Sequence, residues 1–399
     1  MLVSAPVAWA DTAPSYAELL SRSIENAPAL LEQVANVRAA QGDARQARAW
    51  PNPSIGADFE NIGGSSVSNS PSTPQTTFTV TQPLDVFKRG PRIAAGNAGI
   101  VAAQARGAQA KVEYAAQLAL AYATSEAMQQ RLQLADEDVG RAREDLRAAN
   151  ALVDAGKEAK LRSVQAQASV SSAVASREAA LSNLAEALAN LSALAGVPSP
   201  YTGVTPSLLT PDVQAARVMG PSDGTPPAVA AAQAERDAVD AQVRVERSKA
   251  IPDIGLSGGV RRFGGSDETG FVVGVTSRIP LFDRNGGAIA ATEARRDAAD
   301  QRLAAARLSS QAARNIALTQ ITSSQARLKA TTEGEAAAQE AYRLSRIGYD
   351  SGKTPLIEVL TIRRALLDAR ALTIDARLAR VSALVALARV DGRLAFGDN

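Results

Sequence analysis

The sequence predicts a mixed α and β membrane protein in which long helical hairpins continue from β-strands that copies of the chain must share. Three observations predict this class. The chain repeats itself, its long proline-free segments carry a seven-residue apolar period, and four short segments alternate apolar and polar residues. A seven-residue period is typical of helices that coil around one another. Alternation is typical of strands that have one apolar and one polar face.

The composition favours closely packed helices and disfavours most enzymes. Aromatic residues make up 4% of the 399 residues, and the chain contains neither Cys nor His. Without Cys, disulfides, thiolate metal sites and lipid attachment through an N-terminal Cys are excluded. Without His, the commonest general base and transition-metal ligand is missing. We therefore expect no enzyme, no cofactor and no metal site. The 43 basic and 41 acidic residues are interspersed, so we expect no nucleic-acid partner.

The first ten residues resemble the end of a secretory signal peptide. Ala8-Trp9-Ala10 fits an A-x-A cleavage pattern and follows a short apolar stretch, although the usual basic residues before it are missing. We expect cleavage between Ala10 and Asp11, and export of the chain. No run of about 18 apolar residues occurs, so no transmembrane helix is expected.

An internal duplication is the most informative feature of the chain. Four short motifs recur in the same order, displaced by 199, 199, 197 and 196 residues. Fixed-period self-similarity indicates repeated structural units. The pairs are Pro28-Ala29-Leu30 with Pro227-Ala228-Val229, Pro53-Ser54-Ile55-Gly56 with Pro252-Asp253-Ile254-Gly255, Pro83-Leu84 with Pro280-Leu281, and Ala155-Gly156-Lys157 with Ser351-Gly352-Lys353.

The duplication predicts one plan for both halves: a helix, two strands, and a long helical hairpin that turns at Gly156 or Gly352. A segment rich in Pro, Gly, Ser and Thr separates the halves and is interpreted as a surface linker. The expected ranges are 1–10 for the signal remnant, 11–196 for the first repeat, 197–227 for the linker, 228–394 for the second repeat and 395–399 for the tail. Strands are expected at about 53–62, 75–83, 252–263 and 269–279, and helical hairpins at 91–195 and 287–391.

Heptad spacing predicts coiled-coil packing within the hairpins. Leu132, Val139, Leu146 and Val153 recur every seven residues, and alanines follow the first three of them three places later. The last helix carries a second such series that starts at Leu360. Large residues facing alanine let neighbouring helices approach closely. On periodicity alone, a soluble coiled-coil spacer explains these stripes equally well.

The four strands favour a membrane barrel over that spacer. In the second strand, Phe78 and Val80 alternate with threonines, and in the last strand Phe271, Val273 and Val275 share one face. Four strands cannot close a barrel, and open sheet edges are not tolerated in lipid. Copies of the chain must therefore pool their strands into a cyclic homo-oligomer, which two or three copies satisfy. The alternative is a pair of soluble hairpins packed on the helices.

The order and spacing of several motifs resemble the TolC-type outer-membrane factors, from about residue 15 to residue 394. The motifs are Gln82-Pro83-Leu84, Ile279-Pro280-Leu281-Phe282, and Tyr349-Asp350-Ser351-Gly352-Lys353 before Leu360. The C-terminal part, from Gly352 to Arg370, is most similar to the heavy-metal efflux branch of CzcC- and CusC-like members.

This resemblance implies a homotrimer, with a 12-stranded barrel in the outer membrane of a Gram-negative bacterium and a 12-helix tunnel in the periplasm. It implies a passive conduit that contacts outer-membrane lipid and docks through a periplasmic adaptor (membrane fusion protein) on an inner-membrane pump of the resistance–nodulation–division type. The narrower resemblance points to heavy-metal cations as cargo. Two alternatives remain: a periplasmic coiled-coil adaptor, and a structural protein without channel activity.

The resemblance also implies candidate gate residues near the hairpin turns. In TolC-type proteins, a Tyr before the Gly turn and an acid six residues after the Gly constrict the pore; Tyr349 and Glu358 occupy these places. Arg162 stands in the first repeat where an acid is often found, and Thr354 stands where the best-known member has Arg. We hypothesise a mixed ring in which Glu358 faces Arg162 or Arg363. The alternative is that these are solvated coiled-coil charges, which contribute little individually.

Overall fold

The computed structural model describes residues 11–62, 73–209, 224–265 and 267–397. Ala10, and with it the expected cleavage position before Asp11, lies outside these residues. The chain divides into two compact units. Unit 1 comprises Met1–Glu32, Ala108–Ala228 and Leu308–Asn399, and unit 2 comprises Gln33–Gly107 and Val229–Arg307.

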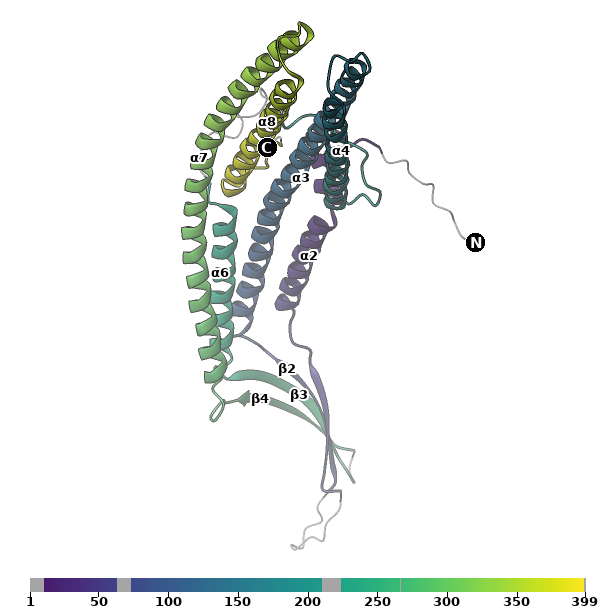
Figure 1. Cartoon of the computed structure of the whole chain (residues 1–399). Helices are drawn as coiled ribbons and strands as arrows, with labels where there is room; N and C mark the ends of the chain where they lie inside the picture. Colours follow the sequence, from purple (N-terminus) through teal and green to yellow (C-terminus); the bar gives the residue numbers. More distant parts are fainter. Residues whose placement is uncertain (1–10, 63–72, 210–223, 266, 398–399) are drawn as a thin grey trace, which may run out of the picture. The chain divides into compact units, whose positions relative to one another are not determined.

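Figure 1 labels most of the helices and strands, and the helices α2, α3, α6 and α7 supply residues to both units. Within the described ranges, no helix is both long enough and apolar enough to cross a membrane. The elements are α1 (Tyr16–Asn26), α2 (Pro28–Arg48), β1 (Ser54–Glu60), β2 (Gln75–Pro83), α3 (Arg89–Asp154), α4 (Lys160–Leu194), α6 (Pro227–Ser248), β3 (Asp253–Phe263), β4 (Thr269–Arg278), α7 (Gly286–Asp350) and α8 (Leu356–Val390).

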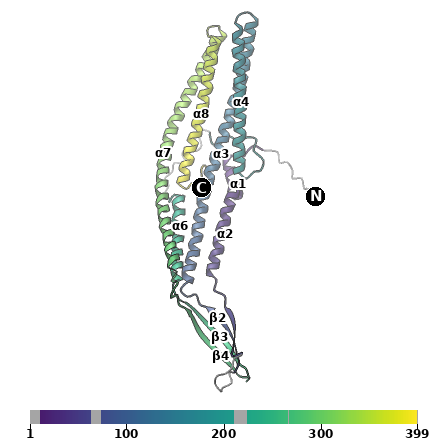
Figure 2. The same ribbon diagram turned by 60° about the horizontal axis from the view of Figure 1, so that its bottom comes forward.

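The long helices form two hairpins, as the two views in Figures 1 and 2 show for α3 with α4 and for α7 with α8. The heptad residues lie between helices: Val139 and Ala142 of α3 are buried in one apolar cluster with Ala173 of α4. The first repeat has one helix more than expected, because α1 and α2 are separate. Ala27 between them is extended, with ψ of 127°, as expected for a residue that precedes a proline.

The two repeats carry equivalent turns and contacts in unit 1. Gly196 follows the end of α4 and Gly392 follows the end of α8, both with positive φ, at 72° and 76°. A Cβ added to Gly196 would lie 3.4 Å from Pro28, and one added to Gly392 would lie 3.0 Å from Pro227. The end of each hairpin therefore packs on the proline that opens the first matching helix of its own repeat. The same contact therefore occurs at equivalent positions of the two sequence repeats.

Two segments expected to lie outside the packed elements of unit 1 are anchored to its core. The carboxylate of Glu126 accepts hydrogen bonds from the backbone N–H groups of Leu208 at 2.9 Å and Leu209 at 3.2 Å, and both leucines are buried. The described part of the expected surface linker is therefore hydrogen-bonded to α3 and packed in the core of unit 1. At the expected tail, the carbonyl oxygen of Ala395 lies 2.7 Å from the hydroxyl of Tyr16, and Ala395 itself is buried.

Unit 2 contains one antiparallel sheet with the strand order β1-β2-β3-β4. Its register places Ala57, Phe78, Val260 and Phe271 in one row across all four strands. No other part of the chain that the structure describes covers this side of the sheet: Phe271 is 88% exposed and Val273 is 85% exposed. The alternation seen in the sequence therefore gives the sheet one continuous, uncovered apolar face.

The opposite face of the sheet is polar and carries small residues. Nε of Arg261 donates a hydrogen bond to Oγ1 of Thr77 at 3.0 Å, and the guanidinium lies 3.7 Å from the carboxylate of Glu60. Gly259 lies so close to the neighbouring strand that an added Cβ would collide with the carbonyl oxygen of Phe78. Glycine is therefore required at this position for close approach of the strands.

Candidate functional site

The hairpin turns of the two repeats have the same backbone geometry. Gly156 and Gly352 adopt positive φ of 69° and 71°, the left-handed conformation that only glycine adopts without strain. The N–H of Lys157 bonds to the carbonyl of Leu152 at 2.9 Å, and the N–H of Lys353 bonds to that of Gly348 at 2.8 Å. These bonds satisfy carbonyls at the helix ends in a Schellman arrangement.

Thr354 packs back into its own turn. Its N–H bonds to the carbonyl of Gly348 at 3.1 Å, and its Oγ1 occupies the space where a side chain at Gly348 would begin. The side chain of Thr354 therefore fills the space left by a glycine of α7. This position supports the shape of the turn.

Tyr349 lies between the two hairpins. It packs against an apolar cluster formed by Ala149 of α3, Ala166 of α4 and Leu356 of α8. Burial raises the pKa of the Tyr349 hydroxyl, and the negative charge of Glu158 adds to that rise. The aromatic ring of Tyr349 thus packs the turn of the second hairpin against the turn of the first.

Glu358 and Arg162 do not form a pair within one protomer. Glu358 is exposed in the first turn of α8, where an acid stabilises the helix N-terminus. Arg162 is half-buried, lies 3.6 Å from the carboxylate of Glu158, and donates to Oε1 of Gln165 at 3.3 Å. Any contact between Glu358 and Arg162 would have to form between protomers.

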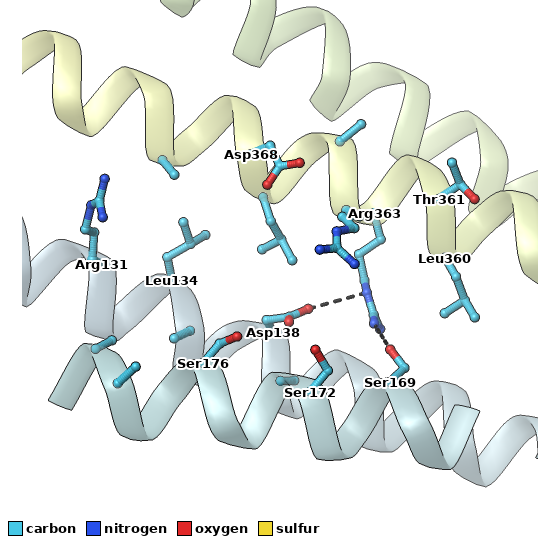
Figure 3. A pocket seen from close by; sticks show the side chains of 18 of the residues that line it. Arg131, Leu134, Asp138, Ser169, Ser172, Ser176, Leu360, Thr361, Arg363 and Asp368 are labelled. Carbon is cyan, nitrogen blue, oxygen red and sulfur yellow. Dashed lines mark hydrogen bonds and ion pairs between the residues drawn. The ribbon is translucent and has the colours of Figure 1, made fainter. Parts of the chain in front are cut away.

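The strongest polar contacts of this region surround Arg363, one turn of α8 beyond Leu360. Nη1 of Arg363 lies 2.6 Å from Oδ2 of Asp145, and Nη2 donates to Oγ of Ser169 at 2.6 Å. Nε lies 3.4 Å from Oδ1 of Asp138. Figure 3 shows Asp138 of α3 and Ser169 of α4 pointing at the guanidinium from two different helices. A single side chain of α8 therefore joins it to both helices of the first hairpin.

A second arginine, from α7, completes this buried charge cluster. Nη1 of Arg346 lies 2.9 Å from Oδ1 of Asp145, so this carboxylate is shared by two guanidinium groups. The side chain of Asp145 is 3% exposed and that of Arg363 is 5% exposed. Burial raises the pKa of the Asp145 carboxyl, and Arg363 and then Arg346 offset part of the rise. Burial likewise raises the pKa of Asp138, with Arg363 and then Arg141 opposing it.

A groove of about 980 Å³ lies beside the cluster in unit 1. It is lined by α3, α4 and α8, and Asp138 and Arg363 form part of its wall (Figure 3). On the α4 side its lining residues include the serines Ser172 and Ser176. The groove follows the line along which the first hairpin meets α8. Among the described residues, no group of three or more His, Cys, Asp or Glu side chains is placed to hold a metal ion.

The hypothesis that Glu358 faces Arg363 does not hold within the protomer, because Arg363 is buried and held by two aspartates. The sequence reasoning missed Asp138, Asp145 and Ser169. A signal for them existed: Asp138 and Asp145 are seven residues apart on α3, and so are Arg363 and Arg370 on α8. Arg370 in turn lies 3.1 Å from Glu137. Charges at heptad spacing on two helices predict a ladder of interhelical ion pairs.

The arrangement of two helical hairpins with an apolar sheet is matched by a known protein family. Residues 19–197 and 225–393 match the family described as outer membrane efflux protein. The chain belongs to this family. Its two matched segments leave out most of the stretch between the repeats, so the match covers both copies of the duplicated plan.

Two curated relatives are similar over nearly the whole chain. The nickel-cobalt-cadmium resistance protein NccC of Alcaligenes xylosoxydans xylosoxydans is 51% identical over 98% of this chain and 89% of its own length. The nickel and cobalt resistance protein CnrC of Cupriavidus metallidurans is 53% identical over 100% of this chain and 95% of its own.

Solved outer-membrane channels share the fold at lower identity. CusC has a TM-score of 0.79 at 18% identity and covers 98% of this chain and 95% of its own. The outer membrane protein VceC of Vibrio cholerae has a TM-score of 0.78 at 20% identity and covers 95% of this chain and 96% of its own. The predicted fold class, strands for a shared barrel continued by a helical tunnel, is confirmed as the fold of these channels.

The predicted function and location are confirmed with the family. The chain is an outer-membrane efflux channel component, with its helical tunnel in the periplasm. Proteins of this family work with a periplasmic adaptor and a pump in tripartite systems. The alternatives of an adaptor or a structural coiled-coil protein are set aside, since the match to the efflux family covers both repeats.

Proposed function

We propose that three copies of this chain form an outer-membrane duct for divalent heavy-metal cations, with nickel and cobalt as the first candidates. The cargo proposal is supported by the 51% and 53% identity to NccC and CnrC, whose names state resistance to nickel and cobalt. Identity of this extent covers barrel, tunnel and hairpin turns alike. The metal is a substrate that passes through the duct.

The trimer is supported by the sheet of unit 2. Strand β1 pairs with β2 alone and β4 with β3 alone among the described strands, so both outer edges carry unpaired backbone groups. In lipid such edges must be hydrogen-bonded. Pairing β4 of one protomer with β1 of the next satisfies both edges, and three copies give 12 strands with room for a lumen. Outer-membrane lipid then contacts the exposed row that contains Phe78 and Phe271.

We further propose that the hairpin ends are the gate. Within a protomer, the cluster of Asp138, Asp145, Ser169, Arg346 and Arg363 holds the second hairpin against the first. Between protomers, the exposed Glu358 is available to form a symmetric charged ring.

Three further residues complete the gate proposal. Arg162 of a neighbouring copy is the candidate partner of the Glu358 ring. Tyr349 and Thr354 support the turn by packing. The duct is passive. A pump of the resistance–nodulation–division type, acting through the adaptor, supplies the energy.

Metal susceptibility tests the cargo. A bacterial strain that carries the cognate pump and adaptor but lacks this chain is complemented with the chain or with an empty vector. We expect the chain to raise the tolerated concentration of Ni²⁺ or Co²⁺ several-fold, and to leave tolerance of an organic dye and a detergent unchanged. Immunoblotting of the outer-membrane fraction checks expression, and Val273→Lys, whose recovery in that fraction should fall, serves as the negative control.

Two outcomes contradict the proposal differently. Restored tolerance of the dye, without a change for Ni²⁺, Co²⁺ or Cd²⁺, overturns the cargo and leaves the duct intact. A monomer on electrophoresis without boiling, together with unchanged tolerance of every compound, overturns the trimeric duct.

A further inference from the structure

All four junctions between helix and strand in unit 2 place an exposed apolar residue within two positions of a basic one. Trp50 is 60% exposed, Phe87 is 51% exposed, Ile251 is 38% exposed and Phe282 is fully exposed. These junctions link α2 to β1, β2 to α3, α6 to β3, and β4 to α7. The basic neighbours are Arg48 and Lys88 in the first repeat and Lys249 and Arg284 in the second. We call these eight residues the junction collar.

The first junction of the collar is built from specific contacts. The guanidinium of Arg89 lies 4.6 Å from the ring centroid of Trp50 and donates to the carbonyl of Arg48 at 3.2 Å. Arg92 donates to the carbonyls of Ala47 and Ala49 at 2.8 and 2.9 Å. Helix α3 thus fixes the three residues that precede Trp50. The indole is held on the surface by the fold, although burying it would be favourable.

The collar lies at the ends of the strands that carry the apolar face. What surrounds that face in the membrane therefore determines what the collar contacts. Residues of the sheet that are as exposed as Phe271 and Val273 lie against hydrocarbon in an outer-membrane channel. At the end of the strands the surroundings change from hydrocarbon to lipid head groups. Girdles of aromatic side chains flank the apolar band of outer-membrane barrels at this depth, and a nearby Lys or Arg is attracted to anionic head groups. The helices that follow are periplasmic, so the nearest leaflet is the inner one.

The net charge of the basic residues in the collar determines which lipid head groups the collar binds. Lys88 lies against Asp253 and Lys249 lies 2.8 Å from Glu246, so these two are neutralised within the chain. Arg278 and Arg284 flank the Phe282 junction; both are exposed, and no ion pair among the described residues involves either of them. Two guanidinium groups without an ion pair, beside a fully exposed aromatic ring, favour an anionic surface over a neutral one.

We propose that the junction collar, with Arg278, is a binding surface for anionic phospholipid head groups of the inner leaflet, and that it fixes the depth of the barrel in the membrane. This proposal rests on the outer-membrane location of the family. It is independent of the cargo and of the gate. A second copy of the chain is the competing occupant of the same surface, and the experiment below separates the two.

Tryptophan fluorescence is a direct probe, because the chain has two tryptophans, Trp9 and Trp50, and Trp9 lies in the expected signal segment. Purified mature protein is reconstituted into phosphatidylcholine vesicles that contain lipids brominated either near the carbonyl or near the end of the acyl chain. We expect Trp50 to be quenched more strongly by the shallow bromines. A second reporter, Trp50→Phe with Phe282→Trp, should give the same depth at the last junction.

The reporter at position 282 also tests the head-group preference. At equal mole fraction, brominated phosphatidylglycerol should quench it at least about two-fold more than brominated phosphatidylcholine. Adding Arg278→Gln and Arg284→Gln should abolish this preference while the depth profile stays the same. The matched control removes two exposed charges from unit 1, Lys329→Gln with Arg364→Gln, and should keep the preference.

Three results would overturn the proposal. Insensitivity of both reporters to every brominated lipid would show that another protomer or water covers the collar. Equal quenching by the two head groups would remove the anionic preference. If the control variant Lys329→Gln with Arg364→Gln also lost the preference for phosphatidylglycerol, the preference would come from the overall charge of the protein and not from the collar. Conductance of the same vesicles reports the duct separately, so a conducting protein with an insensitive collar retains its proposed function.

Discussion

Arg363 and Asp145 form a buried ion pair between the last helix and the first hairpin, with Nη1 of Arg363 2.6 Å from Oδ2 of Asp145. Neither side chain is more than 5% exposed. Such a pair adds little net stability relative to an apolar pair of similar size, because both charges lose their hydration. Its effect is specific: removing one partner leaves the other charged, buried and unpaired. The two hairpins are therefore fixed in one register.

Substitution of Arg363 by Met should loosen the hairpins. Asp145 keeps only Arg346, Asp138 loses its nearest cation, and Ser169 loses its donor. We expect a loss of roughly 3–5 kcal/mol in the docking of the second hairpin. Single-channel conductance in planar bilayers should rise, and the temperature at which the trimer dissociates should fall. Arg364→Gln is the matched control, since Arg364 is the exposed neighbour on the same turn.

The double variant Arg363→Met with Asp145→Leu separates an ion pair from simple loss of packing. Removing both charges should restore part of the thermal stability that Arg363→Met loses, because the buried carboxylate of Asp145 is no longer left without its main partner, whereas Asp138 still lacks Arg363. Equal instability of the single and double variants would contradict this account, as would wild-type conductance of Arg363→Met.

The pH dependence of hairpin docking follows from the raised pKa values of Asp138 and Asp145. The groups that face them are Ser169 of α4, Arg346 of α7, Arg363 of α8, and Arg141 and Glu144 of α3 itself. Burial raises both pKa values above the ordinary 3.8, whereas hairpins that separate expose the carboxyls to water. The docked state therefore binds protons more tightly than the separated state.

The sign of the effect is set by this difference in proton binding. As pH falls from neutral through the raised pKa values toward 3.8, the free energy of docking should become more favourable. Conductance should accordingly fall on mild acidification. The variant with Asp138→Asn and Asp145→Asn should lose this pH dependence, whatever its absolute conductance. A conductance that rises in acid in the wild type and not in this variant would reverse the assignment.

The fold was predictable from sequence where a pattern depends on local chemistry. Gly156 and Gly352 indicated the hairpin turns because a left-handed residue ends each helix. Phe78 and Phe271 indicated the apolar face because strands alternate. The packing of Ala395 against Tyr16 and the anchoring of Leu208 by Glu126 were not predictable. They depend on contacts between segments far apart in sequence.

The candidate site was predictable only in part, for the same reason. Tyr349 and Glu358 were found through their distance from a glycine turn, which is a local signal. The partners of Arg363 lie 194 residues away in Ser169 and 218 residues away in Asp145. Which heptad charges face each other depends on the register of two helices. A single sequence does not contain that register explicitly.

The turn glycine of the second hairpin should be sensitive to alanine, and a glycine within α7 should not. Gly352 has φ of 71°, so Gly352→Ala places a Cβ in the left-handed region at a cost of about 1–2 kcal/mol. Gly334 lies in α7 with no atom near its added Cβ, and Gly334→Ala should stabilise the helix by about 1 kcal/mol. Thermal dissociation of the trimer should therefore fall for the first variant and rise or stay level for the second. A fall of equal size in both would indicate that the turn geometry is unimportant.

Two adjacent valines of β4 test which face of the sheet meets lipid. Val273 lies on the exposed apolar face with Phe271, whereas Val272 pairs with Gly259 on the opposite, polar side. Val273→Lys places a charge against hydrocarbon and should cost roughly 2–4 kcal/mol, while Val272→Lys lies toward the lumen and should be tolerated. The measurement is the fraction of heat-modifiable trimer recovered from the outer membrane, which should fall strongly for Val273→Lys alone. Because the substitutions are identical and one residue apart, charge and strand propensity are matched between them. If Val272→Lys proved the more harmful of the two, the sheet would have to be inverted, with its apolar row inside the barrel.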